Sequence, residues 1–227
     1  MAVQARGGPQ PIPRPHLVRV GDPEPWLGYF GPQMMDDLVD ALSTYEPSEL
    51  VRGPAVSRPA EQGRRSAVLI AIFEGADGPG LILTRRPMHM RKHAGEVAFP
   101  GGSKDDTDES LWHTALREAE EEVGLDPALP KQIAELDSFV TGASYSHVTP
   151  FVAVLDEAPR LTASPDEVDV ILTVPIRELL YPGVYRSEEW FWDDQWVPMH
   201  FFELVGDTVW GATALMLHNL LEALASQ

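Results

Sequence analysis

The chain has 227 residues with 35 acidic and 17 basic side chains, a net charge of −18 at neutral pH. Such an acidic chain argues against general nucleic-acid binding and against docking on anionic membranes, because both partners require a basic surface. It contains no cysteine, which excludes disulfides, zinc-thiolate sites and thiol nucleophiles.

The apolar content of 44% is sufficient for the core of one sizeable domain. The apolar run 67–73 is far shorter than the ~20 residues that a membrane span needs. The N-terminus has arginines but no apolar stretch typical of a secretory signal. We therefore expect a cytoplasmic protein.

Proline and glycine dominate residues 1–30, which predicts an extended or disordered arm. Apolar residues then recur at helical spacing between residues 33 and 44. We therefore divide the chain into an N-terminal extension, residues 1–60, with one helix near 33–44, and a domain formed by residues 61–227.

The domain alternates aliphatic runs of strand length with turn clusters and fewer helical patterns. Strands are predicted at 66–73, 81–86, 95–102, 133–140, 148–155 and 168–176, a hairpin at 190–202, and helices at 109–124, from 177 and at 213–224. The first two strands form a predicted hairpin. This order of elements is typical of a sheet covered by helices on its faces.

The helix at 109–124 carries an unusual concentration of glutamates. Glu118, Glu121 and Glu122 stand at positions i, i+3 and i+4, which share one face of a helix, whereas Glu120 points elsewhere. Three carboxylates on a rigid element suit Mg²⁺ or Mn²⁺. The alternative is a solvated acidic face, which is common on helices.

A glycine corner precedes this helix. Pro100, Gly101 and Gly102 let the backbone approach a ligand closely, so a peptide carbonyl could add a metal ligand. Asp108 lies just before the helix and could pair with Arg117 to hold the loop against it.

The segment "GGSKDDTDESLWHTALREAEEEVGL" resembles the Nudix box, Gly-x5-Glu-x7-Arg-Glu-hydrophobic-x-Glu-Glu-x-Gly-hydrophobic. The matching residues of its second half are Arg117, Glu118, Ala119, Glu121, Glu122, Gly124 and Leu125. The first half departs from the signature. Asp108 stands where the signature has glutamate, and eight residues rather than seven separate it from Arg117.

The resemblance implies an α/β/α sandwich around a mixed sheet, and hydrolysis of a nucleoside diphosphate linked to another group. It implies that Glu118, Glu121 and Glu122 bind or serve the divalent ions, with the Gly101 carbonyl as a further ligand. Arg117 would orient the carboxylates. Nudix enzymes often take an extra carboxylate from a distant loop, and our candidate is Glu167, with Asp169 behind it. The alternative for that loop is an acidic turn.

The residues before the box resemble one Nudix subgroup, the coenzyme A pyrophosphatases, with the pattern Leu-Leu-Thr-x-Arg followed by Leu-Arg-x-His-x-Gly-Gln-Val-Ala-Phe-Pro-Gly-Gly. The counterparts here are Leu83, Thr84, Arg85, Arg91, His93, Gly95, Val97, Ala98, Phe99, Pro100, Gly101 and Gly102. Glu96 replaces the usual glutamine and adds a negative charge near the phosphates. We expect Arg85, Arg91, His93 and Gly102 to bind the substrate.

The subgroup implies hydrolysis of coenzyme A or a derivative to 3′,5′-ADP and 4′-phosphopantetheine, with Mg²⁺ or Mn²⁺. Other diphosphate substrates, such as ADP-ribose, NADH or a dinucleoside polyphosphate, are the nearest alternatives. A non-catalytic nucleotide-binding module is a further alternative, although all three box glutamates are present. The expected partner is a small nucleotide, and a homodimer is left open.

Overall fold

The computed structural model describes residues 5–32, 34–48, 51–52, 63–90, 93–141 and 145–226, with only the backbone at 51–52. The helices are α1 (Met35–Ser43), α2 (Leu111–Val123), α3 (Ile176–Leu179) and α4 (Gly211–Ala225). The strands are β1 (Val18–Val20), β2 (Val51–Arg52), β3 (Arg64–Gly75), β4 (Gly78–Arg85), β5 (Val97–Ala98), β6 (Gly101–Ser103), β7 (Lys131–Glu135), β8 (Phe139–Val140), β9 (Ser146–Leu155), β10 (Val170–Pro175), β11 (Tyr185–Trp192), β12 (Gln195–Glu203) and β13 (Thr208–Trp210).

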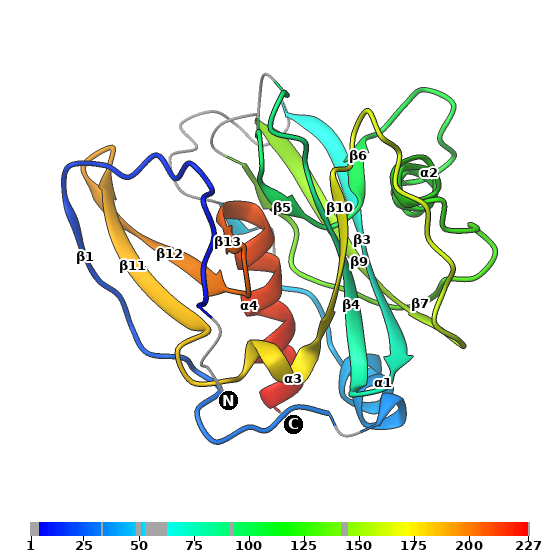
Figure 1. Cartoon of the computed structure of the whole chain (residues 1–227), viewed down its shortest axis with the longest axis horizontal. Coiled ribbons are helices and arrows are strands. Elements are labelled where there is room, and N and C mark those ends of the chain that lie inside the picture. The colour runs from blue at the N-terminus through cyan, green and yellow to red at the C-terminus, as the bar shows by residue number, and fades with distance from the viewer. Residues whose placement is uncertain are drawn as a thin grey trace.

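A large mixed sheet forms the centre of the molecule (Figure 1). Its strand order is β10-β4-β3-β9-β8-β2, with β5 paired to β4, β6 to β3 and β7 to β9. Strand β3 runs parallel to β9 and antiparallel to β4, and the β3–β4 pair is the hairpin that the sequence predicts. The pairing of β6 with β3 brings the glycine corner onto the sheet directly beside α2.

Strand β3 separates two hydrophobic cores. Alternate side chains of a strand point to opposite faces. Ala67, Leu69 and Ala71 accordingly pack with α2, while Ile70 and Ile72 join the core formed with α1 and α4. With helices on both faces of a mixed sheet, the predicted α/β/α sandwich is confirmed.

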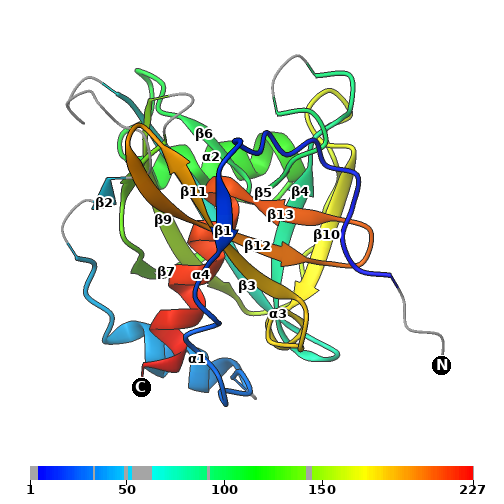
Figure 2. The same ribbon diagram turned by 90° about the vertical axis from the view of Figure 1, so that its left-hand side faces the viewer.

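A second sheet, with strand order β1-β11-β12-β13, lies beyond α4, so that α4 is enclosed between the two sheets (Figure 1). The N-terminal arm runs along this sheet, and its strand β1 pairs with β11 (Figure 2). Trp26 of the arm is 4% exposed and packs beside Tyr185 and His218. The described part of residues 1–30 is therefore mostly extended, and its Trp26 packs into the same core as the later residues.

Several elements are shorter than the sequence predicts. The strand predicted at 95–102 divides into β5 and β6 around Pro100, which has no N–H to donate to a ladder. The strand predicted at 133–140 divides into β7 and β8, with a register irregularity between Gln132 and Ala134. None of the helices in the described part of the chain has the length and hydropathy to cross a bilayer.

Candidate active site

Helix α2 begins and ends at residues that stabilise helix termini. The Ser110 hydroxyl accepts a hydrogen bond from the His113 N–H at 3.1 Å, which caps the first turn. Gly124 ends the helix in a left-handed conformation with φ 66°. The box sequence therefore fixes where the glutamates lie along the helix.

The loop before α2 is held by a buried carboxylate. Asp108 is 5% exposed and accepts hydrogen bonds from Arg117 Nε at 3.0 Å and Nη2 at 3.1 Å. Its Oδ2 also accepts from Thr114 Oγ1 and the Asp105 N–H, both at 2.9 Å. The Arg117 hydrogen bonds hold the pKa of Asp108 well below its usual range. The predicted Asp108–Arg117 pair is therefore formed, and the extra residue in the box does not prevent it.

Arg117 connects this loop to the glutamates. Its Nη2 lies 2.9 Å from Glu118 Oε1 and donates to the Ser103 carbonyl at 3.1 Å. Its Nη1 donates to Glu121 Oε2 at 3.0 Å. The Asp108 carboxylate in particular raises the pKa of Arg117, so the guanidinium stays charged. This arrangement is consistent with the orienting role expected for Arg117.

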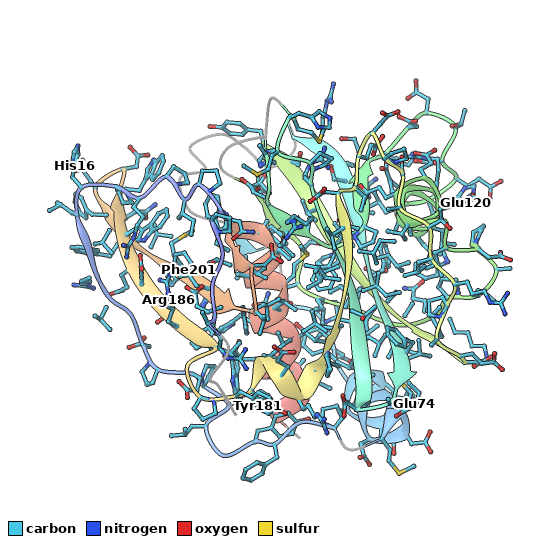
Figure 3. All side chains as sticks on the ribbon, viewed as in Figure 1. His16, Glu74, Glu120, Tyr181, Arg186 and Phe201 are labelled. Atoms are coloured by element: carbon cyan, nitrogen blue, oxygen red, sulfur yellow. The ribbon has the colours of Figure 1, made fainter. Side chains whose placement is uncertain are left out.

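The three box glutamates lie at different depths. Glu122 is 4% exposed, the Glu118 side chain is 15% exposed and the Glu121 side chain is 55% exposed. Burial, and then the neighbouring Glu118, raise the pKa of Glu122 to about 8. Burial also raises the pKa of Glu118. Glu120 is exposed on the side of α2 away from the large sheet, as predicted (Figure 3).

Gly102 makes room for the Glu118 carboxylate. A Cβ at position 102 would lie 2.4 to 2.6 Å from the three carboxyl atoms of Glu118. At Gly101 a Cβ would meet the backbone of β3, at 2.5 Å from the Ala67 carbonyl oxygen. Close packing against β3 therefore requires Gly101, whereas Gly102 leaves the space that the Glu118 carboxylate occupies.

The loop at 162–169 brings a fourth carboxylate to the site. It is fastened to the end of α2, where the Thr162 N–H donates to the Val123 carbonyl at 2.8 Å and the Ser164 N–H to the Glu122 carbonyl at 2.9 Å. Glu167 is exposed, and its charge contributes to the raised pKa of both Glu118 and Glu122. The structure therefore brings Glu167 into electrostatic contact with the box glutamates.

The two arginines at the end of β4 have different surroundings. Arg85 Nε and Nη2 donate to Asp169 Oδ2, and its Nη1 donates to Asp207. Arg86 instead acts on Glu122, whose pKa its charge lowers, and its Nε is buried without a hydrogen-bond partner in the described structure.

Arg86 is therefore the strand-end arginine beside the glutamates, and our prediction singled out Arg85. The subgroup pattern itself contained the signal. In Leu-Leu-Thr-x-Arg one residue separates threonine from arginine, and counting from Thr84 gives Arg86. Substrate contact by Arg85 stays a prediction, and its paired guanidinium favours an anchoring role.

Two other predicted substrate residues lie in the loop between β4 and β5. Arg91 falls outside the described residues. His93 has φ 56°, and its Nδ1 lies 2.8 Å from Glu96 Oε2. Glu96, which departs from the subgroup pattern, therefore has a partner in the same loop.

The site residues suit a divalent cation chemically. Among the described residues no three His, Asp or Glu side chains are gathered in a ready metal site, and Glu118 and Glu121 are drawn to Arg117. Yet the donors are all oxygen, and burial raises the pKa of Glu118 and Glu122, so the charged forms of both carboxyls are disfavoured without a bound cation. A divalent cation would compensate their charge.

Comparison with known proteins identifies the family. The NUDIX domain model matches residues 63–199, more than half of the chain. The chain belongs to the Nudix family. It is 39% identical over 185 residues to the uncharacterized Nudix hydrolase NudL of Escherichia coli O7:K1, covering 81% of this chain and 92% of NudL. The Shigella sonnei NudL is 38% identical over 189 residues, which cover 82% of this chain and 93% of that NudL.

These relatives show that the chain is a Nudix hydrolase, an enzyme acting on a nucleoside diphosphate linked to another group. Among solved structures, a MutT/nudix family protein from Enterococcus faecalis matches with a TM-score of 0.46 and 17% identity, covering 71% of this chain and 62% of its own. The NUDIX domain of Shewanella oneidensis NrtR, complexed with ADP ribose, matches with a TM-score of 0.44 and 17% identity. The match covers 62% of this chain and 84% of the NrtR domain.

Proposed function

We propose that the enzyme hydrolyses the diphosphate bond of coenzyme A or a derivative, releasing 3′,5′-ADP and 4′-phosphopantetheine or its acyl form. The observation that supports this substrate is the run from Leu83 to Gly102, which resembles the coenzyme A pyrophosphatases. Arg86 beside Glu122 is a cation placed to meet phosphate oxygens, for which an arginine fork is well suited.

Glu118, Glu121 and Glu122, with the Gly101 carbonyl, would hold Mg²⁺ or Mn²⁺. When bound, the ion would neutralise the diphosphate, lower the pKa of a bound water and stabilise the leaving oxygen. Arg117 holds two of these carboxylates in place, and Asp108 holds Arg117.

Glu167 is our candidate for the general base. Its exposed carboxylate can accept the proton of the attacking water as oxygen bonds to phosphorus and the anhydride P–O bond breaks. Asp169, the alternative, has its carboxylate engaged by Arg85. We further expect a cytoplasmic location, which fractionation of expressing cells would test.

A substrate panel tests the proposal. Coenzyme A, dephospho-coenzyme A, ADP-ribose and NADH are incubated with Mg²⁺, with Mn²⁺ or with a chelator, and products are separated by chromatography. We expect coenzyme A to have the highest kcat/KM, with activity lost in the chelator. Faster turnover of ADP-ribose or NADH would contradict the substrate, and activity in the chelator would contradict the metal.

Variants on α2 test the site. Glu121→Gln and Glu122→Gln should each lower kcat by at least a hundredfold while the protein stays folded. Glu120→Gln is the matched control, because Glu120 lies on the same helix but faces solvent. Equal losses at all three positions would indicate a structural role for the acidic helix.

A further inference from the structure

Gly8 and Gln10 of the N-terminal arm take part in a buried polar network. Gln10 is 9% exposed, and its Nε2 donates to Asp207 Oδ1 at 2.6 Å. Its Oε1 accepts from the Thr208 N–H at 2.8 Å, and the Gly8 N–H donates to the Thr208 hydroxyl at 3.0 Å. The arm is therefore fixed to the turn between β12 and β13.

Asp207 links Gln10 to Arg85 at the end of β4, in the large sheet. Its side chain is 4% exposed, and both of its oxygens lie 3.3 Å from Arg85 Nη1. A buried carboxylate is stable only when charge or hydrogen bonds compensate it, and Arg85 and Gln10 supply both. Arg85 is held at the end of β4 as a consequence.

The opposite edge of Arg85 holds the loop that carries Glu167. Arg85 Nε and Nη2 donate to Asp169 Oδ2 at 3.1 and 3.0 Å, and the Asp169 N–H donates back to the Arg85 carbonyl at 2.8 Å. The other end of the loop is held at Ser164, whose N–H donates to the Glu122 carbonyl. Glu167 lies between these two anchors.

We propose that Arg85 is a positioning residue: through Asp169 it fixes the loop carrying Glu167, and through Asp207 it makes that loop dependent on Gln10 of the N-terminal arm. The arm would then control an active site that it does not touch. This inference rests on the proposed role of Glu167 in hydrolysis. The competing role for Arg85 is direct contact with substrate.

Hydrogen exchange measured by mass spectrometry tests the positioning without any activity. Arg85→Gln and Asp169→Asn should speed exchange of the Glu167 and Val168 amides, which donate to the Ser164 carbonyl at 3.1 and 2.8 Å. We expect at least a tenfold increase in the 162–170 peptide and no change in α2. Unchanged exchange in both variants would overturn the proposal.

The arm is tested in the same way with a matched pair. Gln10→Ala removes the hydrogen bond to Asp207, whereas Arg19→Gln removes an arm contact to Glu189 that shares no partner with the network in the described structure. We expect the 162–170 peptide to exchange faster than in the wild type in the first variant and at the wild-type rate in the second. Equal effects of the two variants, or none in either, would show that the arm does not reach the loop.

A double-mutant cycle with coenzyme A and Mg²⁺ separates positioning from substrate contact. Arg85→Gln should lower kcat about 10- to 100-fold with little change in KM, because small misplacements of a catalytic group have effects of that size. In a protein that already carries Glu167→Gln, adding Arg85→Gln should lower kcat no further.

If the two substitutions lower kcat independently, so that their fold-effects multiply, and Arg85→Gln also raises KM, the proposal is overturned in favour of substrate contact. If Glu167→Gln alone keeps full activity, the proposed base is wrong, and the exchange measurements still decide whether Arg85 holds the loop. Thermal melting of each variant confirms that the fold is retained.

Discussion

The burial of Glu122 makes an unusual prediction: removing its charge should stabilise the metal-free protein and at the same time abolish turnover. In the fold the pKa of Glu122 is raised from 4.5 to about 8. At about 1.4 kcal/mol per pKa unit, ionising Glu122 in the metal-free fold costs at most roughly 5 kcal/mol. Relaxation and water penetration reduce this cost, and we expect a gain of about 2 kcal/mol for Glu122→Gln at pH 9.

The sign follows from proton linkage. A carboxyl whose pKa is higher in the folded than in the unfolded state contributes full stability below pH 4.5 and loses it as the pH rises through 8. In chelator, Glu122→Gln and the wild type should therefore melt together at pH 5. At pH 9 the variant should melt about 4 to 8 °C higher, since 1 kcal/mol shifts Tm by about 2–4 °C in a chain of this size.

Glu121→Gln is the control, because the Glu121 side chain is 55% exposed and its ion pair with Arg117 contributes little. Its melting temperature should stay near that of the wild type at both pH values. Added Mg²⁺ should stabilise the wild type and not Glu122→Gln. A variant that is no more stable than the wild type at pH 9, or a gap of equal size at pH 5, would refute the reasoning.

Three further outcomes follow from the contacts. Gly102→Ala should keep its melting temperature but lose most turnover, because the added Cβ displaces only the flexible end of Glu118. Asp108→Asn should destabilise by about 3 kcal/mol, since it breaks a buried pair with Arg117; a melting curve matching the wild type would contradict this. Burial and a neighbouring histidine lower the pKa of His200 to about 3, so stability should fall by about 1 kcal/mol from pH 6.5 to 5. Urea titrations of wild type and His200→Gln would show whether that slope disappears.

The local sequence determined the parts of the site that lie within one element. Helix α2 and the common face of Glu118 and Glu122 follow from a period of 3.6 residues. The hairpin of β3 and β4 and the two-sided burial of the central strand follow likewise from continuous aliphatic runs on both sides of a turn cluster. These features depend on neighbours a few positions apart, which is why periodicity and the box signature predict them.

Tertiary structure alone decided the surroundings of two adjacent arginines. Arg85 and Arg86 follow one another, yet one binds aspartates from two later segments and the other lies beside Glu122. It also decided that Gln10, in an arm that composition suggests is loose, is buried against Asp207. The hydrogen bonds of Arg85 and Gln10 to these aspartates join residues 84 to 197 positions apart, and their partners are chosen by the pairing of sheets and not by any local pattern.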